Sequence, residues 1–570
     1  MEKWFVTMKK ADFNEIAAKY HISPILARLI RNRDVAEDAQ IDRYLNGTAE
    51  DLYDGMGMKD MDRAVEILKE KIREHVPIRV IGDYDIDGVN ASYILQKGLS
   101  GLGAVVDTDI PDRIRDGFGL NKMLVDKALE DGIDTIITCD NGIAASDEIA
   151  YGKDQGLTII VTDHHEIPYL ETGEGRNYQM PPADAVVDPH RPDCEYPFKG
   201  LCGAAVAYKL VEALYRAMEK DLSGIRHLME HVAIATVGDV MDLQGENRIF
   251  VKIGLNMLKS TRNAGLKALI ECTGVPADRV SAYHIGFVLG PCINASGRLD
   301  TAKRALALIN AEDAQEALRL AEELKELNDS RKDMTEQGVE QAVEMIENSS
   351  LKEDKVLVIY LPDCHESIAG IIAGRIRERY YRPVFVLTSA EEGVKGSGRS
   401  IESYHMFEEM SRCRELFTRF GGHRLAAGLS LPEENVDVFR KQINELSGLT
   451  EEDLIEKVSI DMQLPLAYLS QKLVEELELL EPFGKGNPKP LFVEKGLRVI
   501  SPRIVGKNQN VLKFQVEDAR GLRMDAVYFG DVRACMEYMK QKNKMAFTYY
   551  PSVNEYMGRK RLQITVVHYR

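Results

Sequence analysis

Short runs of β-branched residues alternate with helix-like segments between residues 78 and 187. The predicted strands are Ile78–Gly82, Ala104–Ile110, Thr135–Cys139, Thr158–Val161 and Ala185–Val187. Strands that are apolar along their whole length and alternate with helices are typical of a parallel sheet covered by helices. The pattern therefore predicts an α/β domain in this part of the chain.

Four other patterns occupy the rest of the chain. Residues 10–75 carry apolar side chains at helical spacings, which predicts several short helices. Residues 301–349 are rich in Ala, Leu, Glu and Lys, which predicts long connecting helices. A second α/β unit is predicted from Val356 to about residue 448. Five further strand-like runs indicate a small barrel; they are Leu497–Ile500, Val511–Val516, Met524–Phe529, Met545–Tyr550 and Leu562–Val567.

The charge is unevenly distributed along the 570 residues. The chain contains 73 Lys+Arg and 91 Asp+Glu, a net charge of −18, which by itself argues weakly against a polyanionic partner. Glu481–Arg570, in contrast, contains 17 Lys+Arg and 8 Asp+Glu, a net charge of +9, and −27 remains for residues 1–480. The predicted barrel is thus basic, and this asymmetry requires a functional explanation.

The sequence also indicates the compartment. No run approaches the roughly 18 apolar residues of a membrane span, and the first residues lead into charged sequence rather than a signal-peptide core. The eight cysteines include no C-x-x-C pair, which is typical of unpaired thiols in a reducing compartment. We therefore expect a soluble, cytoplasmic protein with no membrane association, no zinc finger and no disulfide scaffold.

Acidic and imidazole side chains follow three of the predicted strands. Asp83, Asp85 and Asp87 follow the first strand, Asp140 follows the third, and Asp163-His164-His165 follow the fourth. The carboxyl ends of parallel strands meet at one edge of a sheet, so these side chains are expected to converge. Carboxylates about 4 Å apart repel one another by roughly 4 kcal/mol at an effective dielectric constant of 20, which predicts that cations occupy the cluster.

The residue types indicate which cations these are. Oxygen ligands with one or two imidazoles suit Mn²⁺ or Mg²⁺ better than the thiolate-rich sets typical of zinc. Two ions roughly 3.5–4 Å apart can clamp a phosphoryl oxygen and activate water for in-line attack. A lone Asp-x-Asp or His-His pair is often only structural, but three such motifs in order predict a metal-dependent phosphoesterase.

The chain resembles the DHH phosphoesterase family, and within it the bacterial single-strand-specific exonucleases. The motifs that carry the resemblance are Gly82–Gly88, Asp140–Gly142, the Asp163-His164-His165 triplet, Asp188–Arg191, Val237–Val240, Asn294–Arg298, Gly396–Ser400, Gly421–Gly428 and Glu481–Pro488. The last of these is absent from members of the family that act on small substrates. The match spans nearly the whole chain.

The resemblance implies a domain organisation. It implies a helical leader over residues 1–75, a parallel-sheet DHH domain over 76–300, connecting helices over 301–350, a smaller α/β DHH-associated domain over 351–450 that binds substrate, and an OB-type barrel over 451–570 that holds single strands. Seven aromatic residues of the barrel, of which two or three are expected to face a strand and the others the core, are Phe514, Tyr528, Phe529, Tyr538, Phe547, Tyr549 and Tyr550.

The resemblance also implies roles for the acidic residues and histidines. Asp140 would bridge two ions, one of them also held by Asp85 and Asp83. The other ion would be held by Asp87, His164 and Asp239. His165 would face the scissile phosphate rather than a metal, and Asp163 would support the histidines. Without the resemblance, Asp239 would be read as an ordinary helix-end residue.

The implied substrate contacts lie in both α/β domains. Arg113 and Arg298 are predicted phosphate contacts in the first domain, although an arginine in an exposed salt bridge is an equally simple interpretation. The predicted contacts of the second domain, where glycine-rich loops allow backbone N–H groups to approach a nucleic acid, are His365, Ser397, Arg399, Gly421, Gly422 and His423. A core or capping role is an alternative for His365.

Together these features predict a monomeric, Mn²⁺- or Mg²⁺-dependent exonuclease that degrades single-stranded DNA. The resemblance implies that it digests from the 5′ end, releases 5′-mononucleotides and acts in repair and recombination. A helicase and a single-strand-binding protein are expected partners. One alternative is a DHH phosphodiesterase for short oligonucleotides or cyclic dinucleotides, which the basic barrel opposes. The other is a non-catalytic single-strand-binding relative, which the intact acids oppose.

Where family members commonly have Pro-Arg-Ile-Asn-Ala, this chain has Cys292 in place of the arginine, so one phosphate contact is expected to be missing.

Overall fold

The computed structural model describes residues 2–113, 117, 119–172, 175–556 and 558–570. Contacts between Cα atoms divide the chain into two compact units. One contains mainly Asn263–Thr273 and Pro291–Lys457, and the other contains mainly Trp4–Arg262, Gly274–Gly290 and Val458–Arg570. Within the described residues, no helix combines the length and the apolar composition that crossing a membrane requires.

The first α/β domain is built on a five-stranded parallel sheet with the strand order β3-β2-β4-β5-β8. Its strands are β2 (Pro77–Ile81), β3 (Val105–Asp109), β4 (Thr135–Cys139), β5 (Thr158–Thr162) and β8 (Ala185–Val187). The strands predicted from the sequence are therefore present, and the parallel-sheet prediction is confirmed. β2, β4 and β5 are adjacent, so the three segments that follow them lie at one edge of the sheet.

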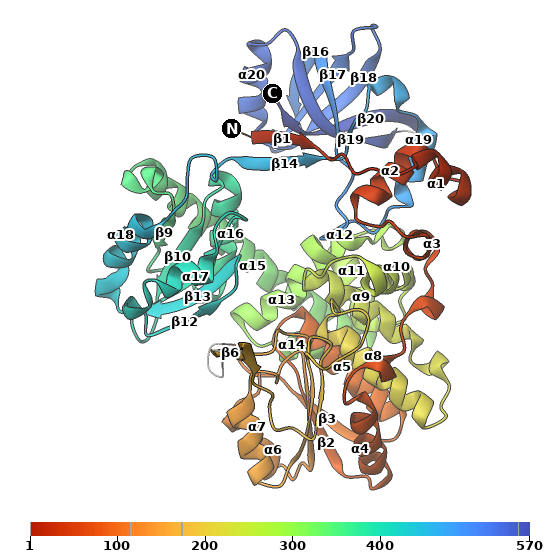
Figure 1. Ribbon diagram of the computed structural model, residues 1–570, viewed down its shortest axis with the longest axis vertical. Helices are drawn as coiled ribbons and strands as arrows, with labels where there is room; N and C mark the ends of the chain where they lie inside the picture. Colours follow the sequence, from red (N-terminus) through yellow and green to blue (C-terminus); the bar gives the residue numbers. More distant parts are fainter. Residues whose placement is uncertain (1, 114–116, 118, 173–174, 557) are drawn as a thin grey trace. The chain divides into compact units, whose positions relative to one another are not determined.

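Helices cover both faces of this sheet (Figure 1). One face carries α6 (Lys122–Glu130) and α7 (Ser146–Asp154), whose apolar residues pack with those of the strands in one core. The other face carries α4 (Met61–Arg73), α5 (Ile86–Gly101) and α8 (Gly203–Ala217). Between β5 and β8 the chain forms an exposed hairpin of β6 (Tyr169–Thr172) and β7 (Gly175–Tyr178). Behind α5 and α8 lie α9 (Met229–Gly238) and α10 (Gly245–Leu258).

The unit made mainly of Asn263–Thr273 and Pro291–Lys457, called the second unit from here on, contains the predicted long helices and a smaller sheet. Its helices include α11 (Ala264–Cys272), α13 (Gly290–Leu299), α14 (Lys303–Asn310) and the 34-residue α15 (Ala314–Glu347). The sheet order is β12-β13-β11-β10-β9, antiparallel except for the β9–β10 pair. Its strands and helices are β9 (Leu357–Tyr360), α16 (Ala369–Tyr380), β10 (Val384–Ser389), β11 (Val394–Arg399), α17 (Met406–Ser411), β12 (Arg419–Gly422), β13 (Ala426–Leu431) and α18 (Val436–Leu446).

The C-terminal segment forms the predicted barrel with OB-type strand order, closed in part by the pairing of β16 with β19. Its elements are β15 (Met462–Gln463), α19 (Gln471–Glu478), β16 (Phe492–Val505), β17 (Val511–Glu517), β18 (Arg523–Tyr528), α20 (Val532–Lys540), β19 (Met545–Tyr556) and β20 (Arg559–Tyr569). The predicted fold class is confirmed. Of the seven barrel aromatics, Phe514, Phe547 and Tyr549 are buried in the core, whereas Phe529 is exposed.

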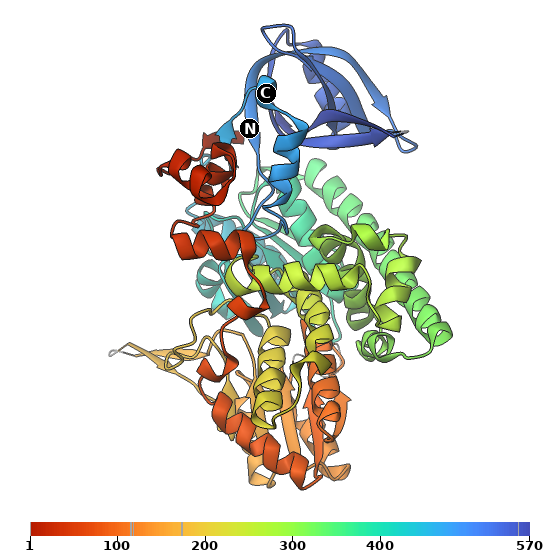
Figure 2. The ribbon, with the colours of Figure 1, turned by 90° about the vertical axis from the view of Figure 1, so that its right-hand side faces the viewer.

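The predicted N-terminal helices do not form a core of their own. α1 (Phe13–Tyr20), α2 (Pro24–Asn32) and α3 (Asp38–Asn46) pack with the barrel in one apolar cluster, and Figure 2 shows them in red beside the blue C-terminal segments. α4 instead packs on the parallel sheet. The first strand, β1 (Glu2–Val6), which the sequence pattern did not predict, pairs with β14 (Glu456–Ile460).

Candidate metal centre

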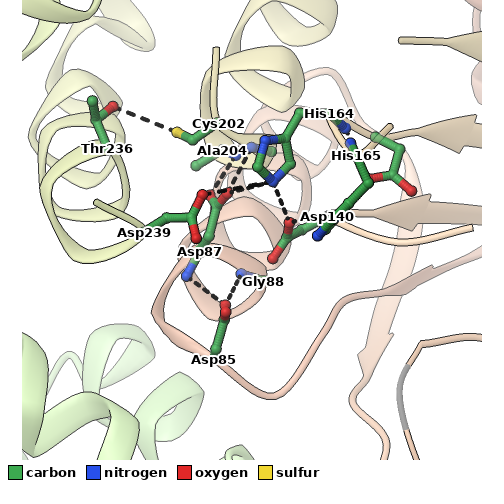
Figure 3. A network of polar contacts seen from close by, with 12 residues as sticks. Asp85, Asp87, Gly88, Asp140, His164, His165, Cys202, Ala204, Thr236 and Asp239 are labelled. Carbon is green, nitrogen blue, oxygen red and sulfur yellow. Dashed lines mark hydrogen bonds and ion pairs between the residues drawn. The ribbon is translucent and has the colours of Figure 1, made fainter. Parts of the chain in front are cut away.

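Seven acidic or imidazole side chains converge at the carboxyl edge of the parallel sheet, and most of them are labelled in Figure 3. Three sets have ligand atoms that all lie within 4.8 Å of one another: Asp83, Asp85 and Asp140; Asp87, His164 and Asp239; and Asp140, His164 and His165. Asp140 belongs to two of these sets, and its Oδ1 atom lies 3.0 Å from His164 Nε2, which belongs to the third. The convergence predicted from the strand ends is present, and Asp239 joins it from the end of α9.

His164 lies at the centre of this cluster. Its Nε2 atom is 3.0 Å from Asp140 Oδ1, 3.5 Å from Asp87 Oδ2 and 3.7 Å from Asp239 Oδ2. The imidazole also hydrogen-bonds to the backbone of Leu201, and burial lowers the pKa of His164 to about 4. The ring is therefore neutral at neutral pH, which is the form that binds metal ions.

Local backbone structure holds the carboxylates in place. Asp85 caps the N-terminus of α5, because its Oδ1 accepts hydrogen bonds from Asp87 N (2.9 Å) and Gly88 N (3.1 Å). Asp87 accepts hydrogen bonds from the first N–H groups of α8, Gly203 N (2.6 Å) and Ala204 N (2.7 Å). These donors orient the Asp87 carboxylate and place it in the positive field of the helix N-terminus.

The close approach of α8 requires glycine at position 203. A Cβ atom at Gly203 would lie 2.6 Å from Asp140 Cβ and 2.9 Å from Asp140 Cα. Asp140 itself has a left-handed backbone conformation, with φ of 60°. Non-glycine residues with positive φ are uncommon and often mark functional sites, so the backbone at Asp140 is constrained by its surroundings.

Asp163 and His165 form a separate pair beside the cluster. Asp163 Oδ1 lies 2.7 Å from His165 Nδ1, and Asp163 Oδ2 accepts a hydrogen bond from Ile143 N at 2.9 Å. Burial disfavours the charged imidazole, but the hydrogen bond and charge of Asp163 outweigh it and raise the pKa of His165 to about 9. The His165 side chain keeps 43% of its surface exposed, against 8% for His164. His165 is therefore the imidazole that a substrate can reach.

The electrostatics of the cluster fit bound cations. Burial, followed by repulsion from neighbouring carboxylates, raises the pKa of Asp83 and Asp140 well above its usual range, that of Asp87 to about 7 and that of Asp239 to about 8. Asp83 Oδ1 is buried and has no hydrogen-bond partner among the described residues. An oxygen-rich donor set of this kind matches Mn²⁺ and Mg²⁺, so the residues present fit divalent metal ions.

We expect the metal-free protein to lose stability as the pH rises from about 4 to about 8, the interval between the unfolded-state and folded-state pKa values of two buried carboxyls. In the unfolded chain Asp87 and Asp239 ionise near pH 4, whereas in the fold their pKa values are about 7 and 8. Their raised folded-state pKa values favour the fold at low pH, and this contribution disappears as the pH rises through 7 and 8. Thermal denaturation checks this: Mn²⁺ should raise the melting temperature more at the higher pH. An Asp239→Asn control should show a smaller pH effect, and a pH-independent gain would contradict the prediction.

The predicted substrate contacts are divided between the two units. Arg113 belongs to the same unit as the metal cluster, and its guanidinium lies 4.9 Å from the centre of the Tyr84 ring. The other seven belong to the second unit. There Arg298 Nη1 donates a hydrogen bond to Ser367 O (2.8 Å), and His365 Nδ1 lies 2.7 Å from Ser367 Oγ. His365 thus has the capping position that was its alternative interpretation, at the short helix before α16.

The other predicted contacts of the second unit lie on its sheet. Ser397 and Arg399 are on β11, and the Arg399 guanidinium lies against Gly370 near the start of α16. Gly421 and Gly422 are on the edge strand β12, and His423 N donates a hydrogen bond to Ala426 O (2.8 Å) in the turn to β13. The structure thus brings Arg298 together with His365, and Ser397 together with Arg399.

Comparison with known proteins identifies the domains and the family. Family models match at residues 77–236 (DHH family, N-terminal domain), 353–448 (DHHA1 domain) and 460–568 (RecJ OB domain). The single-stranded-DNA-specific exonuclease RecJ of Escherichia coli strain K12 is 32% identical, and the alignment covers 98% of each chain. The chain belongs to the RecJ family. RecJ of Bacillus subtilis strain 168 is 34% identical, with 99% of this chain and 70% of the relative covered.

Solved RecJ structures have the same fold. The crystal structure of RecJ from Thermus thermophilus in complex with Mn²⁺ matches with a TM-score of 0.83 and 28% identity, covering 100% of this chain and 79% of that chain. The corresponding Mg²⁺ complex matches with a TM-score of 0.79 and 27% identity, covering 100% and 78%. The resemblance inferred from the motifs is therefore confirmed.

The sequence of this RecJ family member did not predict a groove that lies beside Asp239. It is a cavity of about 880 Å³ lined by Val240, Tyr283 and Phe287 among other residues. The Tyr283 and Phe287 rings stack at 4.9 Å, and their side chains are 64% and 68% exposed. Four lysines also line the groove: Lys252, Lys259, Lys485 and Lys489. Two aromatic residues four positions apart, with Gly286 directly before the second, were the available sequence signal.

Cys292, at the position where family members commonly have arginine, is buried. Its side chain is 1% exposed, and its Sγ accepts a hydrogen bond from Asn328 Nδ2 on α15 at 3.4 Å. Burial raises the pKa of the Cys292 thiol to about 11. The side chain is therefore an uncharged part of the packing between α13 and α15.

Proposed function

We propose that this RecJ family member is a metal-dependent exonuclease that digests single-stranded DNA from the 5′ end, releases 5′-mononucleotides and acts in repair and recombination. The observation that carries the proposal is the cluster of buried carboxylates around His164, which opens beside an aromatic and basic groove. The names of the relatives, single-stranded-DNA-specific exonucleases, support the same substrate.

Two divalent ions are proposed for the cluster. Asp140 would contact both ions, Asp85 and Asp83 would complete the ligands of one, and Asp87, His164 and Asp239 those of the other. When bound, such ions supply Lewis-acid charge and an activated water for attack on phosphorus. Mn²⁺ and Mg²⁺ are both proposed cofactors, since RecJ of Thermus thermophilus binds each of them.

His165 and Asp163 are proposed as the catalytic pair. His165 is exposed enough to face a phosphate, and its hydrogen bond to Asp163 keeps it protonated near neutral pH. A cationic imidazole in this position would stabilise the negative charge that develops on the phosphate. Because Asp163 also accepts a hydrogen bond from Ile143 N, it fixes the orientation of the ring.

The other predicted contacts are proposed to bind the strand. Arg113 would contact a phosphate beside the metal cluster. In the second unit the proposed contacts to the backbone of the strand are Arg298, His365, Ser397, Arg399, Gly421, Gly422 and His423. Arginine side chains and exposed backbone N–H groups are the usual phosphate donors.

We expect the aromatic pair of the groove to hold bases by stacking. Replacing both Tyr283 and Phe287 with alanine should weaken single-strand binding by about 1–3 kcal/mol for each base that loses a stacking partner. Binding of a labelled oligonucleotide with Ca²⁺ in place of Mn²⁺ measures the loss without hydrolysis. The matched control is Tyr169→Ala, since Tyr169 on β6 is 41% exposed and lies outside both the groove and the barrel. Equal binding by the double variant and the control would contradict this role.

The proposed activity is tested with single-stranded DNA that carries different labels at its two ends. Early release of the 5′ label as mononucleotide, in the presence of Mn²⁺ and with duplex DNA and RNA left intact, is the expected result. Release from the 3′ end, or a preference for dinucleotides, would keep the metal chemistry and overturn the polarity or the substrate. Strand binding without any product would favour a non-catalytic role.

The proposal also concerns the oligomeric state, the compartment and the partners of the enzyme. We propose that it acts as a monomer in the cytoplasm and receives single strands from a helicase or a single-strand-binding protein. Sedimentation of the pure protein at several concentrations tests the first point, and a concentration-dependent mass would contradict it.

A further inference from the structure

The turn that carries Asp239 is held by a segment more than 240 residues later in the chain. This segment, Glu481–Pro488, lies between α19 and β16 and belongs to the same unit as Asp239. Leu243 N, just after the turn, donates a hydrogen bond to Lys485 O at 2.8 Å. Gln244 Nε2 donates to Gly486 O, also at 2.8 Å. The backbone of the segment therefore accepts two hydrogen bonds from residues 243 and 244.

The contact between the segment and the turn is close. Gly486 has φ of 70°, and a Cβ atom there would lie 3.0 Å from Asp242 Cβ. A Cβ atom at Gly484 would lie 2.7 Å from Leu243 Cδ1. Lys485 Nζ lies 3.6 Å from Asp242 Oδ1. Both glycines are thus sites where a side chain would push against the residues that follow Asp239.

The turn itself is strained. Val240, next to Asp239, has φ of 56°, a left-handed conformation that is rare for a β-branched residue. Met241 N donates a hydrogen bond to Thr236 O at 3.0 Å, which ends α9 at this point. A strained conformation persists only when the surrounding structure enforces it, and the hydrogen bonds from residues 243 and 244 to the segment supply such support.

Buried hydrogen bonds of Asn487 connect the segment to the N-terminal helices. The side chain of Asn487 is fully buried, and all its polar atoms are paired. Its Oδ1 accepts hydrogen bonds from Arg33 Nε and Tyr44 Oη, both at 2.8 Å. Its Nδ2 donates to the carbonyls of Leu480 and Pro482, both at 2.7 Å. The N-terminal helices, the segment and the turn after α9 thus form one continuous set of contacts.

We propose that Glu481–Pro488 is a positioning segment for Asp239. It holds the turn after α9 in the conformation that directs the Asp239 carboxylate at His164, and so it sets the affinity of the metal site from outside the DHH domain. The inference rests on the proposed function in one respect, the role of Asp239 as a metal ligand. Gly486 and Gln244 are the positioning residues, since neither belongs to the metal cluster.

The test compares two glycines with the same backbone conformation. Gly486→Val places a side chain against Asp242, whereas Gly521→Val, at φ of 84°, meets nothing within 4 Å. Both carry similar backbone strain. Mn²⁺ binding to the full-length protein is followed by electron paramagnetic resonance, and hydrolysis of a single strand is followed as a function of Mn²⁺. Gln244→Met, which loses the hydrogen bond to Gly486 O without adding bulk, is the milder second variant.

We expect Gly486→Val to raise the Mn²⁺ concentration for half-maximal binding about ten-fold or more, as loss of an outer partner of a metal site does. Gln244→Met should shift it in the same direction, and Gly521→Val should not. High Mn²⁺ should restore most of kcat, which a general loss of fold would not produce. Wild-type Mn²⁺ affinity in both Gly486→Val and Gln244→Met, with affinity lost in Asp239→Asn, would overturn the positioning role and leave the proposed function intact. Absence of Mn²⁺ binding by the wild-type protein would overturn both.

Discussion

Replacing Asp140 with asparagine is expected to reduce single-strand hydrolysis by about 10³-fold or more, since bound metal ions supply several kcal/mol of charge stabilisation. Asp140 shares one set of ligand atoms with Asp83 and Asp85 and lies 3.0 Å from His164 of the other set, so its loss is expected to affect both proposed ion positions. Initial rates at saturating Mn²⁺, measured on a 5′-labelled strand, give the size of the loss. DNA binding should be retained, because the proposed strand contacts are other residues.

The fold is expected to survive this substitution. Asparagine tolerates the left-handed conformation that Asp140 adopts, and it replaces a carboxyl group whose pKa is raised well above its usual range by burial and by the neighbouring carboxylates. The metal-free variant should therefore melt at or above the wild-type temperature. Asp147→Asn, an exposed acid in the first turn of α7, is the matched control and should keep full activity. Full activity of Asp140→Asn would refute the metal assignment.

Replacing His165 with alanine is expected to lower kcat by about 10²–10⁴-fold, the usual contribution of a positioned acid or base group. Mn²⁺ affinity should change little, because His165 Nδ1 is hydrogen-bonded to Asp163 and lies 4.0 Å from Asp140 Oδ1. Single-turnover rates at saturating Mn²⁺ measure the chemical step, and Mn²⁺ binding is measured separately. Asp163→Asn should give a smaller loss of kcat, since the imidazole remains but loses its charged partner.

The comparison with His164 separates the two histidines. His164→Ala removes the group at the centre of the cluster and should weaken Mn²⁺ binding strongly. If His165→Ala weakened Mn²⁺ binding to the same extent, His165 would be a metal ligand instead of a phosphate contact. The short distances among Asp140, His164 and His165 make this a real alternative.

Much of the metal cluster is predictable from the sequence. Asp83, Asp85 and Asp87 follow β2, Asp140 follows β4, and His164 follows β5. Parallel strands place their carboxyl ends at one edge of the sheet. Strands that follow one another in a β-α-β pattern usually lie side by side, so the side chains after these strands are expected to lie close together. Their order in the sheet, β2-β4-β5, confirms that reasoning.

Asp239 shows where such reasoning ends. It caps α9, and periodicity alone treats an acid at a helix end as solvent-exposed. Only the family resemblance predicted that Asp239 is a metal ligand. Only the packing of α9 and α8 on α5 brings Asp239 Oδ2 to 3.7 Å from His164 Nε2. The stacked rings of Tyr283 and Phe287 escaped prediction for the same reason, since an amphipathic pattern does not say which aromatic residues stay exposed.

By itself, therefore, the sequence determined the elements, the α/β class, the carboxylate motifs and the basic character of the C-terminal barrel. These properties depend on local periodicity, on the residues at strand ends and on net charge. Only the tertiary structure decided that the N-terminal helices pack on the barrel, that a groove lies beside Asp239 and that Glu481–Pro488 supports the turn after α9. These are contacts between residues far apart in the chain, and they arise because each apolar face and each buried polar group must find its partner in the folded molecule.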